Sequence, residues 1–260
     1  TVQTVTSADG TSIAFEGLGQ GPALVLLGGA FCSRSATGPL ADALQYSFTV
    51  FNVDRRGRGD SGDTRPYGVE REIEDIAAVI DAAGGSASVF GHSSGATLAL
   101  RAAAHGAPIT KLVLYEPPFD VDGERPPLAG DFPKRLDALV EEGRRGDAVE
   151  LYQAEAVGMP LQVVEQLRGA PFRPSLEAIA HTLAYDAAVV GDLRLPHALS
   201  DNVTVPTLVI AGENSPPLLG NAARALAEAL PAGTLRVLEG QSHDVDAAVT
   251  AGEIERFLLR

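Results

Sequence analysis

The segment Gly91-His92-Ser93-Ser94-Gly95 constrains the fold more than any other part of this 260-residue chain. It lies between a short apolar run, 87–90, and an Ala/Leu-rich stretch, 94–105. This order predicts a buried strand, a tight turn and a helix. Glycines at 91 and 95 permit a strained turn that exposes the Ser93 hydroxyl, and the helix start leaves the Ser94 NH free to face a developing negative charge.

The surrounding sequence predicts a sheet built around this turn. Segments 2–8 and 11–17 alternate apolar and polar residues around Asp9-Gly10, which predicts a hairpin. Nearly continuous apolar runs, typical of strands buried on both faces, lie at 23–27, 48–53, 87–90, 111–115, 207–211 and 235–238. Helical patterns cover 69–83 and 94–105. We therefore expect an α/β fold with a mostly parallel eight-stranded sheet flanked by helices.

Residues 118–200 interrupt this alternation of strands and helices. Helical patterns follow one another there without a strand between them, at 133–145, 147–157, 161–167 and 176–190. The strand pattern resumes after Val205-Pro206. We expect a helical lid at 118–200, inserted into a core made of residues 1–117 and 201–260.

Charge and cysteine content restrict the partners and the compartment. The formal net charge is -14, and the basic residues cluster only at Arg55, Arg56 and Arg58, so we expect neither nucleic acid nor a membrane as partner. The single cysteine, Cys32, cannot form an internal disulfide, and no apolar run approaches the ~20 residues that span a bilayer. We expect a cytoplasmic protein, either a monomer or a homodimer.

Four segments resemble the α/β-hydrolase superfamily, and the resemblance covers essentially the whole chain. These segments are 26–31, 54–62, the turn at 91–95, and Gly240-Gln-Ser-His243. The resemblance implies that Ser93 is the nucleophile and His243 the base, in the chain order Ser, acid, His. It also implies that the oxyanion hole combines the NH groups of Ser94 and Ala30, with Phe31 as the alternative to Ala30. In segment 54–62 we expect the arginines to form ion pairs that fix the loop.

Two positions depart from the family pattern. Gly28-Gly29 stands where many relatives have His-Gly, and Ser215 stands where the catalytic acid is expected after the seventh strand. We expect Glu116, after the sixth strand, to replace that acid, an arrangement similar to that of some haloalkane dehalogenases. Asp120, Glu213 and Asp186 remain alternatives, and Asp244 adjoins His243 in sequence only.

A serine at this turn favours an acyl-enzyme intermediate. We expect a serine hydrolase (EC 3.1) that cleaves a small or medium carboxylic ester, lactone or thioester, with Phe31, His92 and Tyr185 at the substrate. No motif for a metal or a cofactor is present, so we expect neither. A carbon-carbon bond hydrolase or a perhydrolase could use the same residues. Further alternatives are a non-hydrolytic small-molecule receptor, an inactive scaffold, and a biosynthetic enzyme for acyl transfer or cyclisation.

Overall fold

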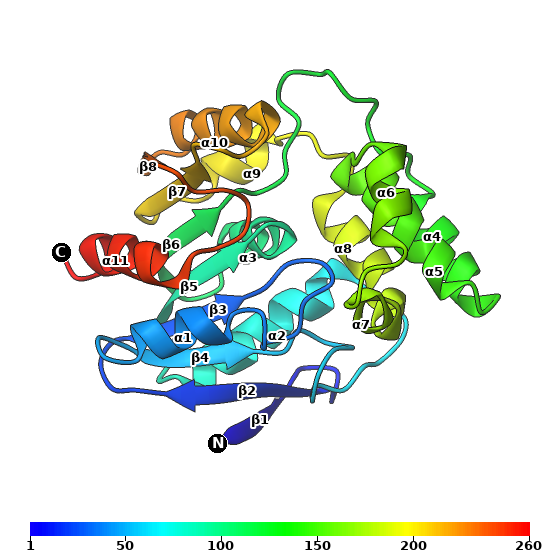
Figure 1. Cartoon of the computed structure of the whole chain (residues 1–260). Helices are drawn as coiled ribbons and strands as arrows, with labels where there is room; N and C mark the ends of the chain where they lie inside the picture. Colours follow the sequence, from blue (N-terminus) through cyan, green and yellow to red (C-terminus); the bar gives the residue numbers. More distant parts are fainter.

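The computed structural model describes residues 1–260 and contains one eight-stranded sheet flanked by helices (Figure 1). The strands lie in the order β1-β2-β4-β3-β5-β6-β7-β8. β1 and β2 form the predicted hairpin, β2 pairs antiparallel with β4, and all other pairs are parallel. The strands are β1 (Val2–Thr6), β2 (Ser12–Leu18), β3 (Ala23–Leu27), β4 (Thr49–Val53), β5 (Ala87–His92), β6 (Ile109–Tyr115), β7 (Thr207–Gly212) and β8 (Gly233–Leu238). The predicted α/β sheet is confirmed.

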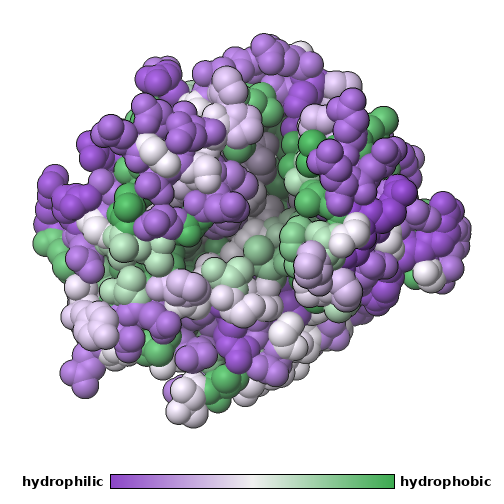
Figure 2. Space-filling model, in the orientation of Figure 1, coloured by the Kyte–Doolittle hydropathy of each residue, from purple (hydrophilic) through white to green (hydrophobic).

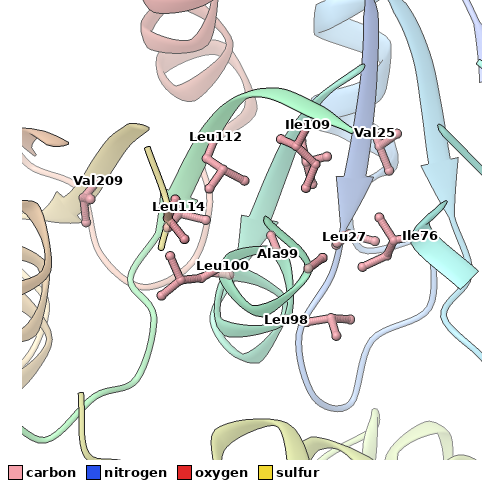
Figure 3. Close-up of a cluster of buried hydrophobic side chains, with 14 of the residues drawn as sticks. Val25, Leu27, Ile76, Leu98, Ala99, Leu100, Ile109, Leu112, Leu114 and Val209 are labelled. Carbon is pink, nitrogen blue, oxygen red and sulfur yellow. The ribbon is translucent and has the colours of Figure 1, made fainter. Parts of the chain in front are cut away.

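The central strands are apolar throughout because both faces of the sheet are covered. In β3, Val25 and Leu27 enter one hydrophobic cluster while Leu24 and Leu26 enter another on the opposite face. Side chains alternate across a strand, so a continuous apolar run supplies both clusters. The first cluster lies under α2 (Val69–Ala82), α3 (Ser94–Ala104) and α10 (Pro217–Ala229), and the second under α1 (Gly38–Leu44) and α11 (Ala247–Leu258). Figure 3 shows side chains of β3 and β6 from the first cluster around α3.

Between β6 and β7 the chain forms helices and loops but no strand. A group of them stands together at one side of the sheet (Figure 1) around its own hydrophobic cluster. We call this group, which runs from Phe132 to Val190, the helical insertion. It consists of α4 (Phe132–Glu141), α5 (Arg145–Leu151), a π-helical turn (Tyr152–Val157), α6 (Leu161–Leu167), α7 (Arg173–Ala178), a 3-10 turn (Ala180–Thr182) and α8 (Leu183–Val190). The next helix, α9 (His197–Asp201), instead places Leu199 in the first core cluster.

Two predicted helices are divided in the structure. The segment 147–157 changes from α5 to the π-helical turn, which ends at Gly158 with φ 81°. The segment 176–190 is broken at the 3-10 turn, where the Thr182 hydroxyl donates to the Ile179 carbonyl. Such side-chain bonds to the backbone compete with regular helix formation. Four helices have no counterpart in the sequence prediction: α1, α9, α10 and α11.

No helix is both long and apolar enough to cross a membrane.

Candidate active site

The turn after β5 is held in a strained conformation. Ser93 has φ 56° and ψ -123°, a region that costs a non-glycine residue of the order of 1–3 kcal/mol. Its NH donates to the Tyr115 carbonyl at 2.9 Å, which ties the turn to the end of β6. A Cβ at Gly91 would lie 2.4 Å from the Gly95 carbonyl oxygen, and one at Gly95 would lie 2.4 Å from the Gly28 carbonyl oxygen. Both glycines are therefore required by close backbone packing.

His243 and Glu116 are joined by a hydrogen bond. The Nδ1 atom of His243 lies 2.7 Å from Oε1 of Glu116, and Oε2 of Glu116 accepts the Gly212 NH at 2.9 Å. The carboxylate is completely buried at the end of β6, where Glu116 itself has φ 48°. Because one oxygen accepts the imidazole NH, the tautomer is set and Nε2 of His243 is left as the proton acceptor.

The pKa of Glu116 lies below its ordinary value. Burial acts to raise the pKa, but hydrogen bonding from His243 and the Gly212 NH favours the charged form more strongly. The carboxylate is therefore ionised at neutral pH and can stabilise an imidazolium beside it.

The other acidic candidates have different partners. Asp120 accepts the NH groups of Gly123 and Arg125, Glu213 accepts the Gly240 NH, and Asp186 pairs with arginines. Among the carboxylates considered, only Glu116 is hydrogen-bonded to the His243 ring.

His92 lies beneath the loop that carries His243. Its Nε2 lies 2.8 Å from the His243 carbonyl oxygen, and the two ring centroids are 4.8 Å apart. Burial, followed by the charge of His243, lowers the pKa of His92 to about 4. The neutral ring can therefore donate from Nε2 at neutral pH. The Tyr115 hydroxyl supports the same loop by donating to the Ser242 carbonyl at 2.5 Å, a contribution that the sequence analysis did not identify.

The loop after β3 approaches the nucleophile closely. A Cβ at Gly29 would lie 3.1 Å from Cβ of Ser93, so this position leaves little room for a side chain. Phe31 has φ 65° and packs edge-to-face on Tyr152 at 5.5 Å. Ala30 and Phe31 both border the hydrophobic cluster of the helical insertion. Ala30, in the loop after β3, and Ser94, at the start of α3, thus lie on segments that meet at Ser93.

Tyr185 is used for packing. It is 1% exposed, its ring stacks on Tyr67 at 4.1 Å, and its hydroxyl donates to Asp63 at 2.6 Å. The ring and the hydroxyl are thus both occupied within the protein, and contact of Tyr185 with substrate stays a prediction. Sequence could not reveal the bond to Asp63, because Asp63 lies 122 residues away.

The arginine loop forms the expected ion pairs. Arg56 pairs with Asp75 at 2.7 Å and with Asp9 at 2.9 Å. Arg55 pairs with Glu72 and Asp186, each at 2.7 Å. Both arginines are buried, so they stabilise the loop from within.

A hollow in the surface separates the helical insertion from the core that contains the sheet (Figure 2). In Figure 2, which has the orientation of Figure 1, the hollow lies between the helical insertion and the core, and hydrophobic residues border it. The Ser93 turn, Glu116 and the His243 loop follow β5, β6 and β8, at the carboxyl edge of the sheet, where open α/β sheets bind ligands. No group of three or more His, Cys, Asp or Glu side chains is arranged to hold a metal.

Comparison with known proteins identifies a family model and related solved structures. Residues 24–251 match the family model described as "Alpha/beta hydrolase family". A solved α/β hydrolase from Sphaerobacter thermophilus DSM 20745 is 53% identical, with a TM-score of 0.92 over 98% of this chain and 99% of that one. An enol-lactonase from Burkholderia xenovorans LB400 shares the fold, at 22% identity and a TM-score of 0.72 over 99% of this chain and 100% of that chain.

A curated relative gives a partial match. N-formylmaleamate deformylase from Pseudomonas putida KT2440 is 37% identical over 131 residues, which cover 49% of this chain and 47% of the relative. The chain thus matches about half the length of that protein.

Proposed function

The chain belongs to the α/β-hydrolase family, and from this premise we propose that it is a serine hydrolase acting on a small or medium carboxylic ester, lactone or thioester. One observation carries the proposal: the hydrogen bond from His243 to the buried Glu116, at the same edge of the sheet as the strained Ser93 turn. An ionised, buried carboxylate on this imidazole, beside the nucleophile turn, supports catalysis over a scaffold role.

The proposed reaction begins with attack of Ser93 Oγ on the substrate carbonyl carbon. His243 Nε2 takes the serine proton, and Glu116 stabilises the imidazolium. The NH groups of Ser94 and Ala30 donate to the oxyanion. His243 then gives its proton to the leaving group. A water molecule attacks the acyl-enzyme while His243 takes its proton, and His243 passes that proton to Ser93 Oγ as the acid product leaves.

The site around this chemistry is proposed to bind an acyl group through Phe31, on the border of the helical insertion. We assign His92 a supporting role instead, since its ring nitrogen contacts the His243 backbone. The insertion would serve as a lid, which agrees with the hollow that separates it from the core in Figure 2.

A second candidate is hydrolysis of a short amide such as a formamide. It is favoured by the 37% identity to N-formylmaleamate deformylase over 131 residues. Ester cleavage and amide cleavage use the same nucleophile and base, so they differ in the leaving group and the substrate pocket. Parallel assays of p-nitrophenyl acetate hydrolysis and of formate release from N-formyl amides decide between them.

The test of the nucleophile is intact mass after incubation with a fluorophosphonate. The parent should gain one adduct, and Ser93→Ala should gain none while unfolding at a similar temperature. A folded parent that gains no adduct would favour the receptor or scaffold alternative. Incorporation of solvent oxygen-18 into the product separates hydrolysis from acyl transfer or cyclisation.

A further inference from the structure

A buried ionic network joins the helical insertion to the two loops at Ser93. Its centre is Asp186 on α8, which has no exposed surface. Oδ1 of Asp186 accepts from Arg55 at 2.7 Å and from the Ser94 hydroxyl at 2.7 Å. Oδ2 accepts from Arg58 at 2.9 Å. One carboxylate from the insertion therefore binds three groups of the core.

The same two arginines hold the loop after β3. Nη1 of Arg58 donates to the Gly29 carbonyl at 2.9 Å, and Nη1 of Arg55 donates to the Gly28 carbonyl at 3.3 Å. The Gly29 carbonyl belongs to the same peptide group as the NH of Ala30, which is one proposed oxyanion donor. A peptide plane is rigid, so binding the Gly29 carbonyl restricts the direction of the Ala30 NH on the same plane.

The other proposed donor is fixed by the same carboxylate. Ser94 begins helix α3, and its side-chain hydroxyl is bonded to Asp186 while its NH lies at the helix start. Both proposed oxyanion donors therefore belong to peptide segments that Asp186 holds, one directly and one through two arginines.

The charges within the network balance. Arg55 and Arg58 face Asp186 and Glu72, and the Tyr67 hydroxyl donates to Glu72 at 2.6 Å. Burial alone would raise the pKa of Asp186, but the two arginines and Ser94 bring it below its ordinary value. A neutral replacement for Asp186 would leave the buried Arg58 without a carboxylate partner and Arg55 with Glu72 alone.

We propose that Asp186 is a positioning residue for the oxyanion hole, holding Arg55, Arg58 and Ser94 so that the loop after β3 presents its NH to the substrate. The catalytic consequence rests on the function proposed above. It also means that α8 is part of the catalytic scaffold, although it lies in the helical insertion.

The test compares Asp186→Asn with Asp75→Asn. Asp75 is a matched control because it also pairs with a buried arginine of the same loop, Arg56, but Arg56 makes no bond to the loop after β3. Asp186→Asn should lower kcat for a p-nitrophenyl ester about 10- to 100-fold with little change in KM, since oxyanion donors act in the transition state. Asp75→Asn should lower the unfolding temperature and leave kcat near that of the parent.

Hydrogen-deuterium exchange tests the positioning itself, without any need for turnover. The amides of residues 27–32 should exchange faster in Asp186→Asn than in the parent, and at the parent's rate in Asp75→Asn. Unchanged exchange in Asp186→Asn, or equal losses of kcat in the two variants, would overturn the proposal. If Asp186→Asn does not fold, Ser94→Ala removes one hydrogen bond of the network instead. This variant should show a smaller loss of kcat and faster amide exchange at the Ser93 turn. Unchanged kcat and unchanged exchange in Ser94→Ala would overturn the proposal as well.

Failure of the proposed function gives a different result. A parent protein that no fluorophosphonate labels would end the serine-hydrolase assignment, whereas the exchange comparison still decides whether Asp186 holds the loop.

Discussion

At the residue scale, backbone strain coincides with the site. Four residues other than glycine have positive φ: Phe31, Ser93, Glu116 and Leu193. The first three lie at the loop after β3, the nucleophile turn and the end of β6. Strained residues persist only where surrounding contacts hold them, and they concentrate at functional sites. The strained backbone at these three positions and the hydrogen bond between Glu116 and His243 therefore indicate the same site.

Replacing the proposed acid tests the residue that occupies an unusual position. Glu116→Gln should lower kcat by about 10²- to 10⁴-fold, because an amide neither stabilises the imidazolium nor sets the tautomer. Ser215→Ala should change kcat only slightly, since its buried hydroxyl makes no hydrogen bond in the structure. Steady-state kinetics on one ester would show this ranking, and adding Ser215→Asp to Glu116→Gln should restore part of the activity. The reverse ranking of the single variants would move the acid to another residue.

The pKa of His92 predicts how stability depends on pH. In the folded state this pKa falls from 6.5 to about 4, so below pH 6.5 the unfolded chain binds a proton that the folded protein does not. Stability is then lost as the pH falls from about 6.5 to about 4, by roughly 2 kcal/mol for a partly buried ring. His92→Gln, which keeps a donor for the His243 carbonyl, should lose less in urea unfolding over this range. Parallel curves for the two proteins would contradict this.

At the element scale, the close approach of α3 to β3 determines where the nucleophile lies. Gly95 in the first turn of α3 faces the carbonyl oxygens of Leu27 and Gly28, at 2.8 and 2.4 Å from an added Cβ. Backbone cannot move aside as a flexible side chain can. The helix can therefore lie this close to β3 only because Gly95 has no side chain.

Two glycine-to-alanine substitutions in helices should have opposite signs. Gly95→Ala should destabilise the protein by about 3 kcal/mol through overpacking. Gly220→Ala in α10, where an added Cβ meets nothing within 4 Å, should stabilise it by about 0.5–1 kcal/mol through helix propensity. Urea unfolding of both variants measures the difference. A loss of stability in Gly220→Ala would contradict the view that α10 tolerates a side chain there.

At the scale of the whole molecule, the charge is far from balanced. The formal net charge of -14 produces self-repulsion in the compact state at neutral pH. Arg55 and Arg58, next to the site, are buried and paired with Asp186, so their charges are neutralised locally.

Salt should therefore stabilise this protein at neutral pH. Raising the ionic strength from about 10 to 150 mM shortens the screening length from about 30 to 8 Å and should raise the unfolding temperature at pH 7. The same addition near the isoelectric point should have a smaller effect. Scanning calorimetry at both pH values measures this, and an equal response would mean that net charge is not the cause.

Local patterns in the sequence determined the strands, the hairpin and the nucleophile turn. Continuous apolar runs specify strands covered on both faces, and the glycines around Ser93 specify a turn within a few residues. The ion pairs of the arginine loop were also predictable in kind, because buried guanidinium groups need carboxylate partners. Helix boundaries in the insertion were predicted less well, since turns such as Ala180–Thr182 depend on local side-chain bonds.

Only the tertiary structure decided which of the candidate acids contacts His243 and which groups surround Asp186. Glu116 and His243 are 127 residues apart, and Asp186 lies 131 residues from Arg55 and 92 from Ser94. The sequence analysis named Asp186 as a reserve acid, whereas packing gives it arginine and serine partners. Tyr185 is hydrogen-bonded to Asp63, and its contact with substrate stays a prediction. The physical reason is that periodicity reports which face of an element is buried, whereas the partner of a buried charge depends on how elements distant in the chain are packed together.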